Sequence, residues 1–545
     1  SLYALHTTHP SWNAAGLVLN GGTLDVVDSS LTGTEGSAVQ VLEGVFTAQR
    51  VDFSDNLQTE DQANGGYGLD VAGPEAEAWV SDSGIHNNRE IGAVVREGGK
   101  LVLKDVEISG TTAGNGLAVG AGVYVADGTL QASGLHIWGT DGLGLAQIGG
   151  VATVQDSLIE GVLGNGRGVE LSGGELTLVD CRLQDLADAG GVIAGGHLDA
   201  TGLEVVSVRA SEAGLGIGLQ IQSSGSAHLQ DSLIDGASTI GLSVQYGGVA
   251  TVDGLEVRNT ASDPTGRFAY GVTAFGGASL SGRDLSVHDN RGVGLLVHDA
   301  TLDLEGLEVW NIGKTLSANA AIGVAVQADS TVELSDAWVH HVSGLGMTSA
   351  GGPTLRCTGC LVEEVGFGGF VVEGGQLELV DSVIRRVGPD DSEGGGVGLF
   401  VDGRPEGPGG VILSGVRIEE CDLAAVYVVQ ESEVLISHST LVAGEGVEHG
   451  GRLFHGDGLV AIEAQVSLVD SAVSEGRVGL FLHGSAVHVQ NLQTSDNGID
   501  LWLQSCEGAP ESTGELPEGE VCPTYDALYI DLSMAAYLDE TGLEP

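Results

Sequence analysis

The chain has 545 residues, of which 90 are glycine, and 42% of the residues are hydrophobic although only 4% are aromatic. This composition excludes a disordered chain and an ordinary helical protein with a core of large side chains, and it favours many short strands. The formal charge of −55 is spread over the whole length, which excludes nucleic acid as a partner, and no apolar run is long enough for direct membrane insertion.

One sequence motif recurs along the chain. It consists of a glycine followed by three short runs in which apolar and polar residues alternate, with a turn after each run. Clear copies are "GVELSGGELTLVDCRL" from residue 168, "GLSVQYGGVATVDGLEV" from 241, "GVAVQADSTVELSDAWV" from 323 and "GFVVEGGQLELVDSVI" from 369. Alternation with a period of two is typical of strands, so each copy predicts one coil of three short strands. Stacked coils can share one apolar interior, which a single coil cannot form. We therefore expect an all-β solenoid of about 19–20 coils over residues 1–505 and a non-repeat C-terminal tail over residues 506–545.

The residue after the second run is Gly, Asp or Asn in nearly every copy. These positions run from Asp28 to Asn491 and include Gly282. Since such residues tolerate positive φ, the column predicts a backbone corner and needs no chemistry. Longer connections precede the opening glycine of mostly alternate copies, for example "LQTEDQANGG" and "GPDDSEGGGV", and they predict a ridge of loops along one edge.

These phrases resemble the right-handed parallel β-helix proteins of the pectate-lyase-like superfamily, most closely the non-catalytic bacterial surface or secreted members. The resemblance covers residues 1–505 and implies an extracellular or bacterial cell-surface location. Of the two functions that it implies, we favour a non-catalytic structural or adhesive solenoid over a polysaccharide lyase or hydrolase. An enzyme needs convergent carboxylates facing an Arg or Lys, and the sequence alone places no such group. Residues 1–14 already read as part of a coil with no capping helix before them, which predicts either that the chain is a fragment of a longer one or that its first coil abuts another molecule, as in assembly end to end.

A single "GGYGLDVAG" at residues 65–73 is similar to a calcium-binding nonapeptide, with Asp70 as the candidate metal ligand. That motif works through tandem copies, and only one copy is present here. Asp70 also occupies the outward position of a coil-opening strand, as do Tyr124 and Gln220. We therefore expect no cofactor, with calcium at Asp70 as the alternative.

Histidine-rich stretches suggest catalysis at first sight. The stretch "HDNRGVGLLVHD" at 288–299 contains two His-Asp dipeptides, which the repeat places at two different corners of one coil. The turn "HNNR" at residues 86–89 is of the same kind as "HDNR" at residues 288–291. Asn88 and Asn290 are therefore expected to form hydrogen bonds with the backbone and to adopt positive φ. His340 and His341 alternate in and out of one strand and are not expected to converge on an ion.

The six cysteines are too few for a disulfide scaffold. Cys357 and Cys360 flank a predicted bend and are expected to form a local disulfide. Cys506 and Cys522 are expected to form a second disulfide that staples the end of the chain. This usage fits an oxidising exterior. Two cysteines lie coils away from any partner and are expected to be free: Cys181 and Cys421.

The outward position of the coil-opening strand changes character along the chain. It is polar in the first half, as an ordinary solvated face would be, and it becomes apolar in the second half at Leu296, Val371, Phe400, Tyr427, Val460, Phe481 and Trp502. Stacked at successive coils, these residues predict an apolar strip, with Phe400, Tyr427, Phe481 and Trp502 as its binding residues. Its cover is the chain's own tail, another protein chain, or carbohydrate on the aromatic rings. We favour the tail, because "YDALYIDLSMAAYLDETG" from residue 525 leaves the repeat and is rich in Tyr, Leu and Ile.

Overall fold

The structure is a computed structural model, and it describes most of the repeat region. The described residues are 15–58, 65–114, 120–211, 215–262, 266, 269–315, 321–390, 394–403, 410–444, 447–449, 452–454, 456–504, 513–514 and 520–521. They contain strands and turns but no helix, and hence no helix that could cross a membrane. The chain divides into two compact units, residues 1–257 and 258–545, where the repeat predicted one domain over residues 1–505.

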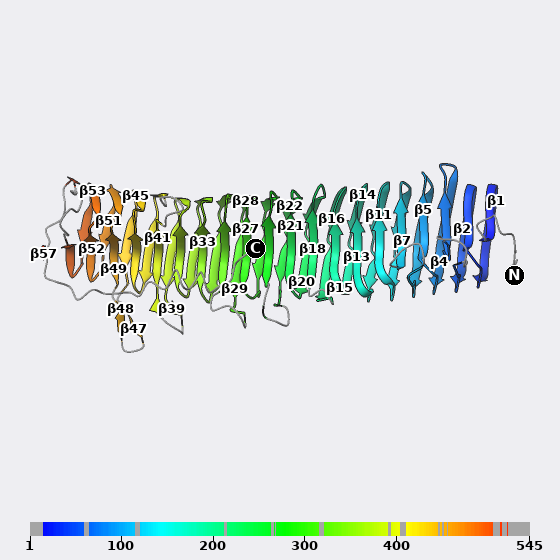
Figure 1. The fold of residues 1–545 in the computed structure, drawn as a ribbon, viewed down its shortest axis with the longest axis horizontal. Helices are drawn as coiled ribbons and strands as arrows, with labels where there is room; N and C mark the ends of the chain where they lie inside the picture. Colours follow the sequence, from blue (N-terminus) through cyan, green and yellow to red (C-terminus); the bar gives the residue numbers. More distant parts are fainter. Residues whose placement is uncertain are drawn as a thin grey trace. The chain divides into compact units, whose positions relative to one another are not determined.

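In the first unit, each coil has an opening, a second and a third strand, and each strand pairs in parallel with its equivalent in the next coil (Figure 1). Two long strands each run through a whole coil: β1 (Ala15–Thr32) and β2 (Ser37–Ser54). The opening strands are β3 (Leu69–Ala72), β5 (Ile91–Arg96), β7 (Gly120–Ala126), β10 (Asp141–Gln147), β13 (Leu163–Leu171), β18 (Gly216–Gln222) and β21 (Ile240–Gln245). The second strands are β4 (Ala76–His86) and β6 (Lys100–Ser109), which both continue into the third run, and β8 (Thr129–Ser133), β11 (Val151–Gln155), β14 (Glu175–Val179), β16 (His197–Thr201), β19 (Ser226–Gln230) and β22 (Val249–Asp253). The third strands are β9 (His136–Trp138), β12 (Leu158–Glu160), β15 (Arg182–Ile193), which continues into the next opening strand, β17 (Glu204–Arg209), β20 (Leu233–Ala237) and β23 (Glu256–Arg258).

The second unit repeats this arrangement. Its opening strands are β24 (Tyr270–Phe275), β27 (Val293–His298), β30 (Ile322–Gln327), β33 (Leu345–Ala350), β36 (Gly368–Glu373), β41 (Val397–Asp402), β44 (Ala424–Val429), β49 (Asp457–Ile462), β52 (Val478–His483) and β55 (Ile499–Gln504). The second strands are β25 (Ser279–Arg283), β28 (Thr301–Glu305), β31 (Thr331–Ser335), β34 (Thr354–Thr358), β37 (Gln376–Val380), β42 (Gly410–Ser414), β45 (Glu433–Ser437), β50 (Gln465–Val469) and β53 (Ala486–Gln490). The third strands are β26 (Ser286–His288), β29 (Glu308–Ile312), β32 (Trp338–Val342), β35 (Leu361–Val365), β38 (Val383–Val387), β43 (Arg417–Cys421), β46 (Thr440–Ala443), β51 (Ala472–Ser474) and β54 (Gln493–Ser495).

Parallel pairing continues beyond the predicted end of the repeat at residue 505. The short strand β56 (Thr513–Gly514) pairs with β53, and β57 (Glu520–Val521) pairs with β55. These two pairings involve residues that follow the predicted repeat, and the domain boundary between residues 505 and 506 stays a prediction. Most of the predicted tail lies outside the described residues, as do residues 1–14.

Two antiparallel hairpins interrupt the second unit. The first joins β39 (Pro389–Asp390) to β40 (Gly394–Gly395), and the second joins β47 (Val447–His449) to β48 (Arg452–Phe454). Both precede an opening strand, and one coil without such a hairpin separates them, as the predicted ridge of loops requires. Parts of the other long connections lie outside the described residues.

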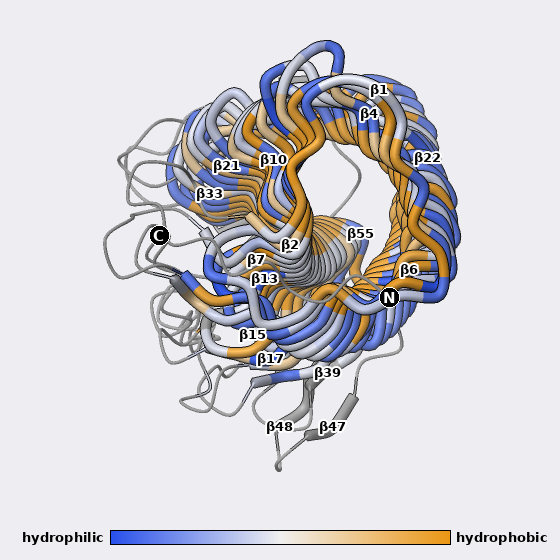
Figure 2. The backbone as a smooth tube through the Cα atoms, turned by 90° about the vertical axis from the view of Figure 1, so that its right-hand side faces the viewer, coloured by the Kyte–Doolittle hydropathy of each residue, from blue (hydrophilic) through white to orange (hydrophobic). Residues whose placement is uncertain are grey.

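The buried residues of the coils are mostly apolar in each unit, and Figure 2 shows hydrophobic residues recurring at equivalent positions of successive coils. On second strands burial alternates, as on β31, where Val332 and Leu334 are buried while Thr331 and Glu333 are exposed. Opening strands behave differently, because β36, β41 and β44 are buried along their whole length on both faces. The all-β parallel β-helix predicted from the repeat is therefore confirmed, and its opening strands carry a second buried surface on the outside.

The predicted corner column has positive φ throughout, from Asp28 to Asn491. One member is out of register: Gly282 pairs with Leu304, and the corner residue of that coil is Asp284, with φ of 53°. The glycine in "LSGR" disguised this shift, because glycine is common in both places.

The glycine that opens a coil is explained by close contact between coils. A Cβ atom on Gly346 would lie 2.6 Å from the carbonyl oxygen of Gly369 and 2.6 Å from Cγ1 of Val362. The same close approach recurs at Gly294 and Gly323. Any side chain at this position would push successive coils apart.

Candidate functional site

The predicted apolar strip is assembled by the register of the opening strands in the second unit. Phe400 on β41 lies opposite Tyr427 on β44, and their ring centroids are 5.9 Å apart. At the end of the column, Phe481 on β52 lies opposite Trp502 on β55. The complete strip, in register order, is Leu296, Ala325, Thr348, Val371, Phe400, Tyr427, Val460, Phe481 and Trp502. Sequence reasoning missed Ala325 and Thr348 because neither is a large apolar residue.

The strip faces outward and is nevertheless shielded from water. Phe400 is 2% exposed, Tyr427 4% and Trp502 8%. By contrast, the outward-facing Ile412 on the second strand β42 is 45% exposed. Burial raises the pKa of the Tyr427 phenol to about 12. Seven of the nine strip residues, all but Thr348 and Trp502, pack with rim residues such as Phe367 into one hydrophobic cluster.

The outward positions of the first unit are not the ordinary solvated face that the sequence predicted. Asp70 is 2% exposed and Ser243 is 1% exposed. On opening strands near Asp70, Tyr67 and Tyr124 pack against a small apolar cluster. The sequence does not reveal this burial, because it depends on side chains from several coils.

Asp70, the candidate calcium ligand, is held by an arginine. Nε and Nη2 of Arg96 lie 3.0 and 3.1 Å from the two carboxylate oxygens, and Nε2 of Gln40 donates to Oδ2 at 2.9 Å. These partners come from the strands on either side of β3. Among the described residues, no group of three or more His, Cys, Asp or Glu side chains is arranged to hold a metal ion. A cation at Asp70 would therefore have to displace the guanidinium group.

An arginine facing two carboxylates is present on the first unit, although sequence analysis could not place one. Nη1 of Arg167 lies 2.9 Å from Oε2 of Glu170, and its Nε lies 2.9 Å from Oδ2 of Asp188. Glu170 occupies the outward position of its opening strand, and Asp188 comes from the following coil. The group was missed because Asp188 has positive φ, which interrupts the strand alternation used to align the coils.

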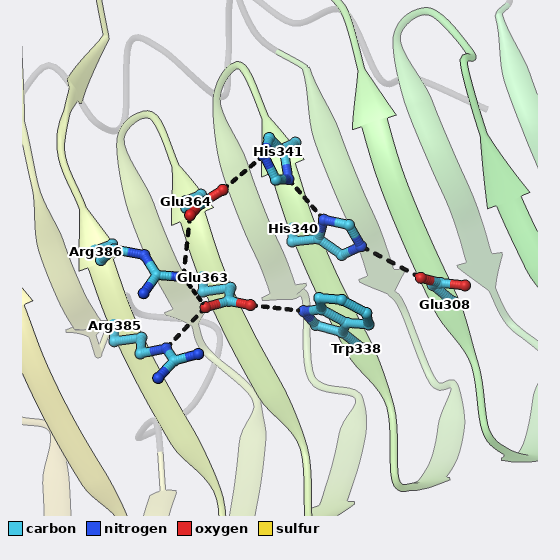
Figure 3. Close-up of polar contacts among 8 residues, drawn as sticks. All are labelled: Glu308, Trp338, His340, His341, Glu363, Glu364, Arg385 and Arg386. Atoms are coloured by element: carbon cyan, nitrogen blue, oxygen red, sulfur yellow. Dashed lines mark hydrogen bonds and ion pairs between the residues drawn. The ribbon is translucent and has the colours of Figure 1, made fainter.

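Figure 3 shows a polar network on the third strands of the second unit, with Glu363 at its centre. Glu363 is 5% exposed. It accepts hydrogen bonds from Nε1 of Trp338 at 3.0 Å and Nε of Arg385 at 2.7 Å, and it also contacts Arg386. Burial by itself raises the pKa of this carboxyl, but the two arginines and the indole outweigh it and hold the pKa below its usual range. Glu363 is thus an ionised carboxylate whose negative charge is balanced by the two arginines.

The second half of the network continues along the same face (Figure 3). Nη2 of Arg386 lies 3.0 Å from Glu364, and the other oxygen of Glu364 lies 2.6 Å from Nε2 of His341. Nδ1 of His341 lies 2.6 Å from Nδ1 of His340, whose Nε2 lies 3.4 Å from Glu308. The network therefore links four third strands, from β29 to β38.

The expected alternation of His340 and His341 between the two faces of one strand is wrong, because Nδ1 of one ring lies 2.6 Å from Nδ1 of the other. His341 is a corner residue with φ of 53°, so strand alternation ends there and both rings lie on the same side. The prediction of separate strand faces holds only inside a regular strand. Each ring also uses Nε2 for a carboxylate, which explains why the pair does not form part of a metal site.

Stacked rings run beside this network. His288 stacks on Trp310 with centroids 4.3 Å apart and planes within 8°, and Trp310 is followed by His340 at 6.0 Å. Trp338 stacks on His340 at 4.0 Å. Because the rings cover each other's faces along successive coils, this ladder stabilises the stacking of coils. Aligning the third runs by their corners would have revealed it.

The asparagines near the His-Asp dipeptides serve the backbone, as predicted. Asn88 accepts a hydrogen bond from the Asn56 amide at 3.3 Å, and Asn290 accepts one from the Thr260 amide at 2.7 Å. Positive φ, however, falls on the preceding residue in each turn, Asn87 or Asp289. The side chains of Asn88 and Asn290 thus make the hydrogen bonds of the turn, while the preceding residue adopts its positive φ.

The cysteines follow the predicted pattern where they are described. Cys357 and Cys360 form a disulfide with Cα atoms 5.8 Å apart, and Cys181 and Cys421 are free and buried. Burial raises the pKa of the Cys181 thiol to about 11 and that of Cys421 further. The predicted pair of Cys506 and Cys522 lies outside the described residues.

Comparison with known proteins agrees with this fold. Residues 215–384 match the family model described as the right handed beta helix region. The fold is that of a right-handed parallel β-helix. No curated protein matches this β-helix protein. Similar solved structures include the periplasmic alginate epimerase AlgG, the A-module of mannuronan C-5 epimerase AlgE4 from Azotobacter vinelandii, and Vag8 in complex with C1 inhibitor.

These three likenesses concern the fold alone. The identities are 10%, 11% and 16%, and the TM-scores are 0.31, 0.30 and 0.42, in the same order. The alignments cover 74%, 73% and 87% of this chain and 76%, 91% and 97% of the other chain.

Proposed function

We propose that this β-helix protein is a non-catalytic structural or adhesive solenoid of a bacterial cell surface. The observation that carries the proposal is the state of two buried carboxylates, Asp70 and Glu363. Asp70 is paired with Arg96 and Glu363 with Arg385, so each carboxylate has a fixed positive partner. A general acid or base must exchange a proton near neutral pH, which a carboxylate neutralised by arginine does poorly.

The network in Figure 3 supports a structural role in a second way. Its contacts join successive coils, from Glu308 on β29 to Arg386 on β38, and therefore resist separation of the coils along the solenoid. The disulfide between Cys357 and Cys360 supports an extracellular location, because disulfides persist mainly in oxidising compartments.

The proposal is tested by imaging the purified chain and assaying it on polysaccharides. We expect negative-stain electron microscopy to show filaments or larger assemblies, and we expect incubation with uronate and neutral glycans to release neither reducing ends nor unsaturated products. Compact monomers that depolymerise a glycan would refute the proposal.

The alternative, a polysaccharide lyase or hydrolase, is favoured by one specific observation. Arg167 faces Glu170 and Asp188 on the first unit, which gives the charged grouping that such an enzyme requires. If glycan cleavage is detected, Arg167→Ala should abolish it, whereas Arg182→Ala on an exposed third-strand ion pair should not.

A further inference from the structure

The apolar strip of the second unit presents an unusual combination of orientation and burial. Its members occupy the outward position of opening strands, yet Val371 is 1% exposed and Phe400 is 2% exposed. The cluster around them is built from aliphatic and aromatic residues. Outward-facing side chains are buried to this degree only where other groups of the chain lie over them.

The chain leaves the last coil beside one end of this strip. Glu520 on β57 lies opposite Trp502, the last strip residue, and Val521 lies opposite Leu503. Residue 522 therefore follows directly from the strand that borders the strip. The given sequence continues through residues 522–545.

That segment is long enough to cover the strip. From Leu296 to Trp502 the strip spans eight steps between paired strands, or about 38 Å at ~4.8 Å per step. Residues 522–545 reach roughly twice that length when extended at about 3.3 Å per residue.

The segment also has the right chemistry. Every second residue from 528 to 538 is apolar, in the order Leu528, Ile530, Leu532, Met534, Ala536 and Leu538. The intervening positions are Tyr529, Asp531, Ser533, Ala535 and Tyr537. In an extended conformation, this pattern gives one wholly apolar face and one partly polar face.

We propose that residues 522–545 of this chain pack along the apolar strip and shield it from water. A covalently attached segment competes at an effective concentration in the millimolar range, which favours it over a second copy or a separate protein. A glycan is disfavoured because sugar recognition combines aromatic rings with several polar groups, whereas most side chains of the strip are aliphatic or aromatic. The proposal is independent of whether the protein is adhesive or catalytic.

Photo-crosslinking in the full chain tests the proposal. Phe481, on the strip, is replaced by benzoylphenylalanine, and the matched control carries the same group at Ile412, which is exposed on another face. We expect irradiation of the Phe481 variant to give monomers crosslinked to a peptide within residues 522–545, and the Ile412 variant to give no such product. Crosslinks from Phe481 to a second copy, or to opening strands alone, would overturn the proposal.

Substitutions in the segment itself give a second readout without touching the coils. Leu528→Asp combined with Leu532→Asp should abolish the crosslink and raise the fluorescence of a hydrophobic dye severalfold while the β-sheet circular dichroism is unchanged. Ser533→Asp is the control, because it alters the alternate face and should preserve the crosslink. If the double variant keeps both the crosslink and the low dye fluorescence, the apolar face is not what binds.

Discussion

Gly346→Ala examines the close contact between coils on which the repeat depends. The new Cβ atom would lie 2.6 Å from the carbonyl oxygen of Gly369 and 2.6 Å from Cγ1 of Val362, whereas ordinary contact begins at 3.4 Å. Both neighbours would have to retreat by 3.4 − 2.6 = 0.8 Å. The carbonyl oxygen of Gly369 is a backbone atom of β36, which pairs with β33. It therefore cannot move without disturbing the hydrogen bonds between these two strands. Overpacking of this kind costs about 1–3 kcal/mol.

Urea unfolding measures the global loss, and amide hydrogen exchange locates it. In a solenoid, damage is local because each coil contacts its neighbours. We therefore expect faster exchange in β33 and β36 and little change in distant coils. The control is Gly313→Ala, where the added Cβ meets no atom within 4 Å, and its cost should stay within about 0.5 kcal/mol. Equal stability of the two variants would refute the close-contact explanation of the glycine column.

Three further predictions concern charge and burial. The pKa of Glu363 is lowered in the folded state. Its ionised form therefore stabilises the fold above the unfolded pKa of about 4.3, and this contribution is lost as the pH falls below that value. In the Glu363→Gln variant, the urea midpoint should therefore decrease less between about pH 5 and about pH 3 than it does in the wild type. Arg96→Met leaves the carboxylate of Asp70, which is 2% exposed, without its ion pair, and should lower the free energy of unfolding in urea by about 2–4 kcal/mol. If calcium raised the melting temperature of the wild-type protein, that would contradict our assignment of Arg96 as the partner of Asp70. Burial raises the pKa of the Cys181 and Cys421 thiols. Iodoacetamide at mildly alkaline pH should therefore modify neither thiol until the chain is unfolded. Rapid labelling of the native protein would contradict their burial.

Much of the fold is predictable from the sequence because the repeat is read by local rules. The alternation of apolar residues marks the strands, and the Gly, Asp and Asn column marks corners with positive φ. The shift from Gly282 to Asp284 shows the limit of this reading, because glycine can mark either a corner or a strand position. The local disulfide is also readable, since Cys357 and Cys360 are close in the chain.

The candidate site was less predictable, since its contacts join residues that lie far apart in the chain. Glu363 and Arg385 give no sign in the sequence that they meet, and the approach of His340 to His341 depends on a corner φ. Similarly, the grouping of Arg167 with Asp188 requires knowledge of which residues of adjacent coils are paired.

By itself, the sequence determined that the chain forms stacked coils with a buried interior, because a period of two and regularly spaced turns permit little else. It also determined where large apolar residues recur, and hence that Phe400 and Tyr427 share a column. Only the tertiary structure decided that this outward column is shielded and that Asp70 is buried beside Arg96. The physical reason is that burial and ion pairing depend on the register between coils, and register is set by the summed packing of many residues, not by any local motif.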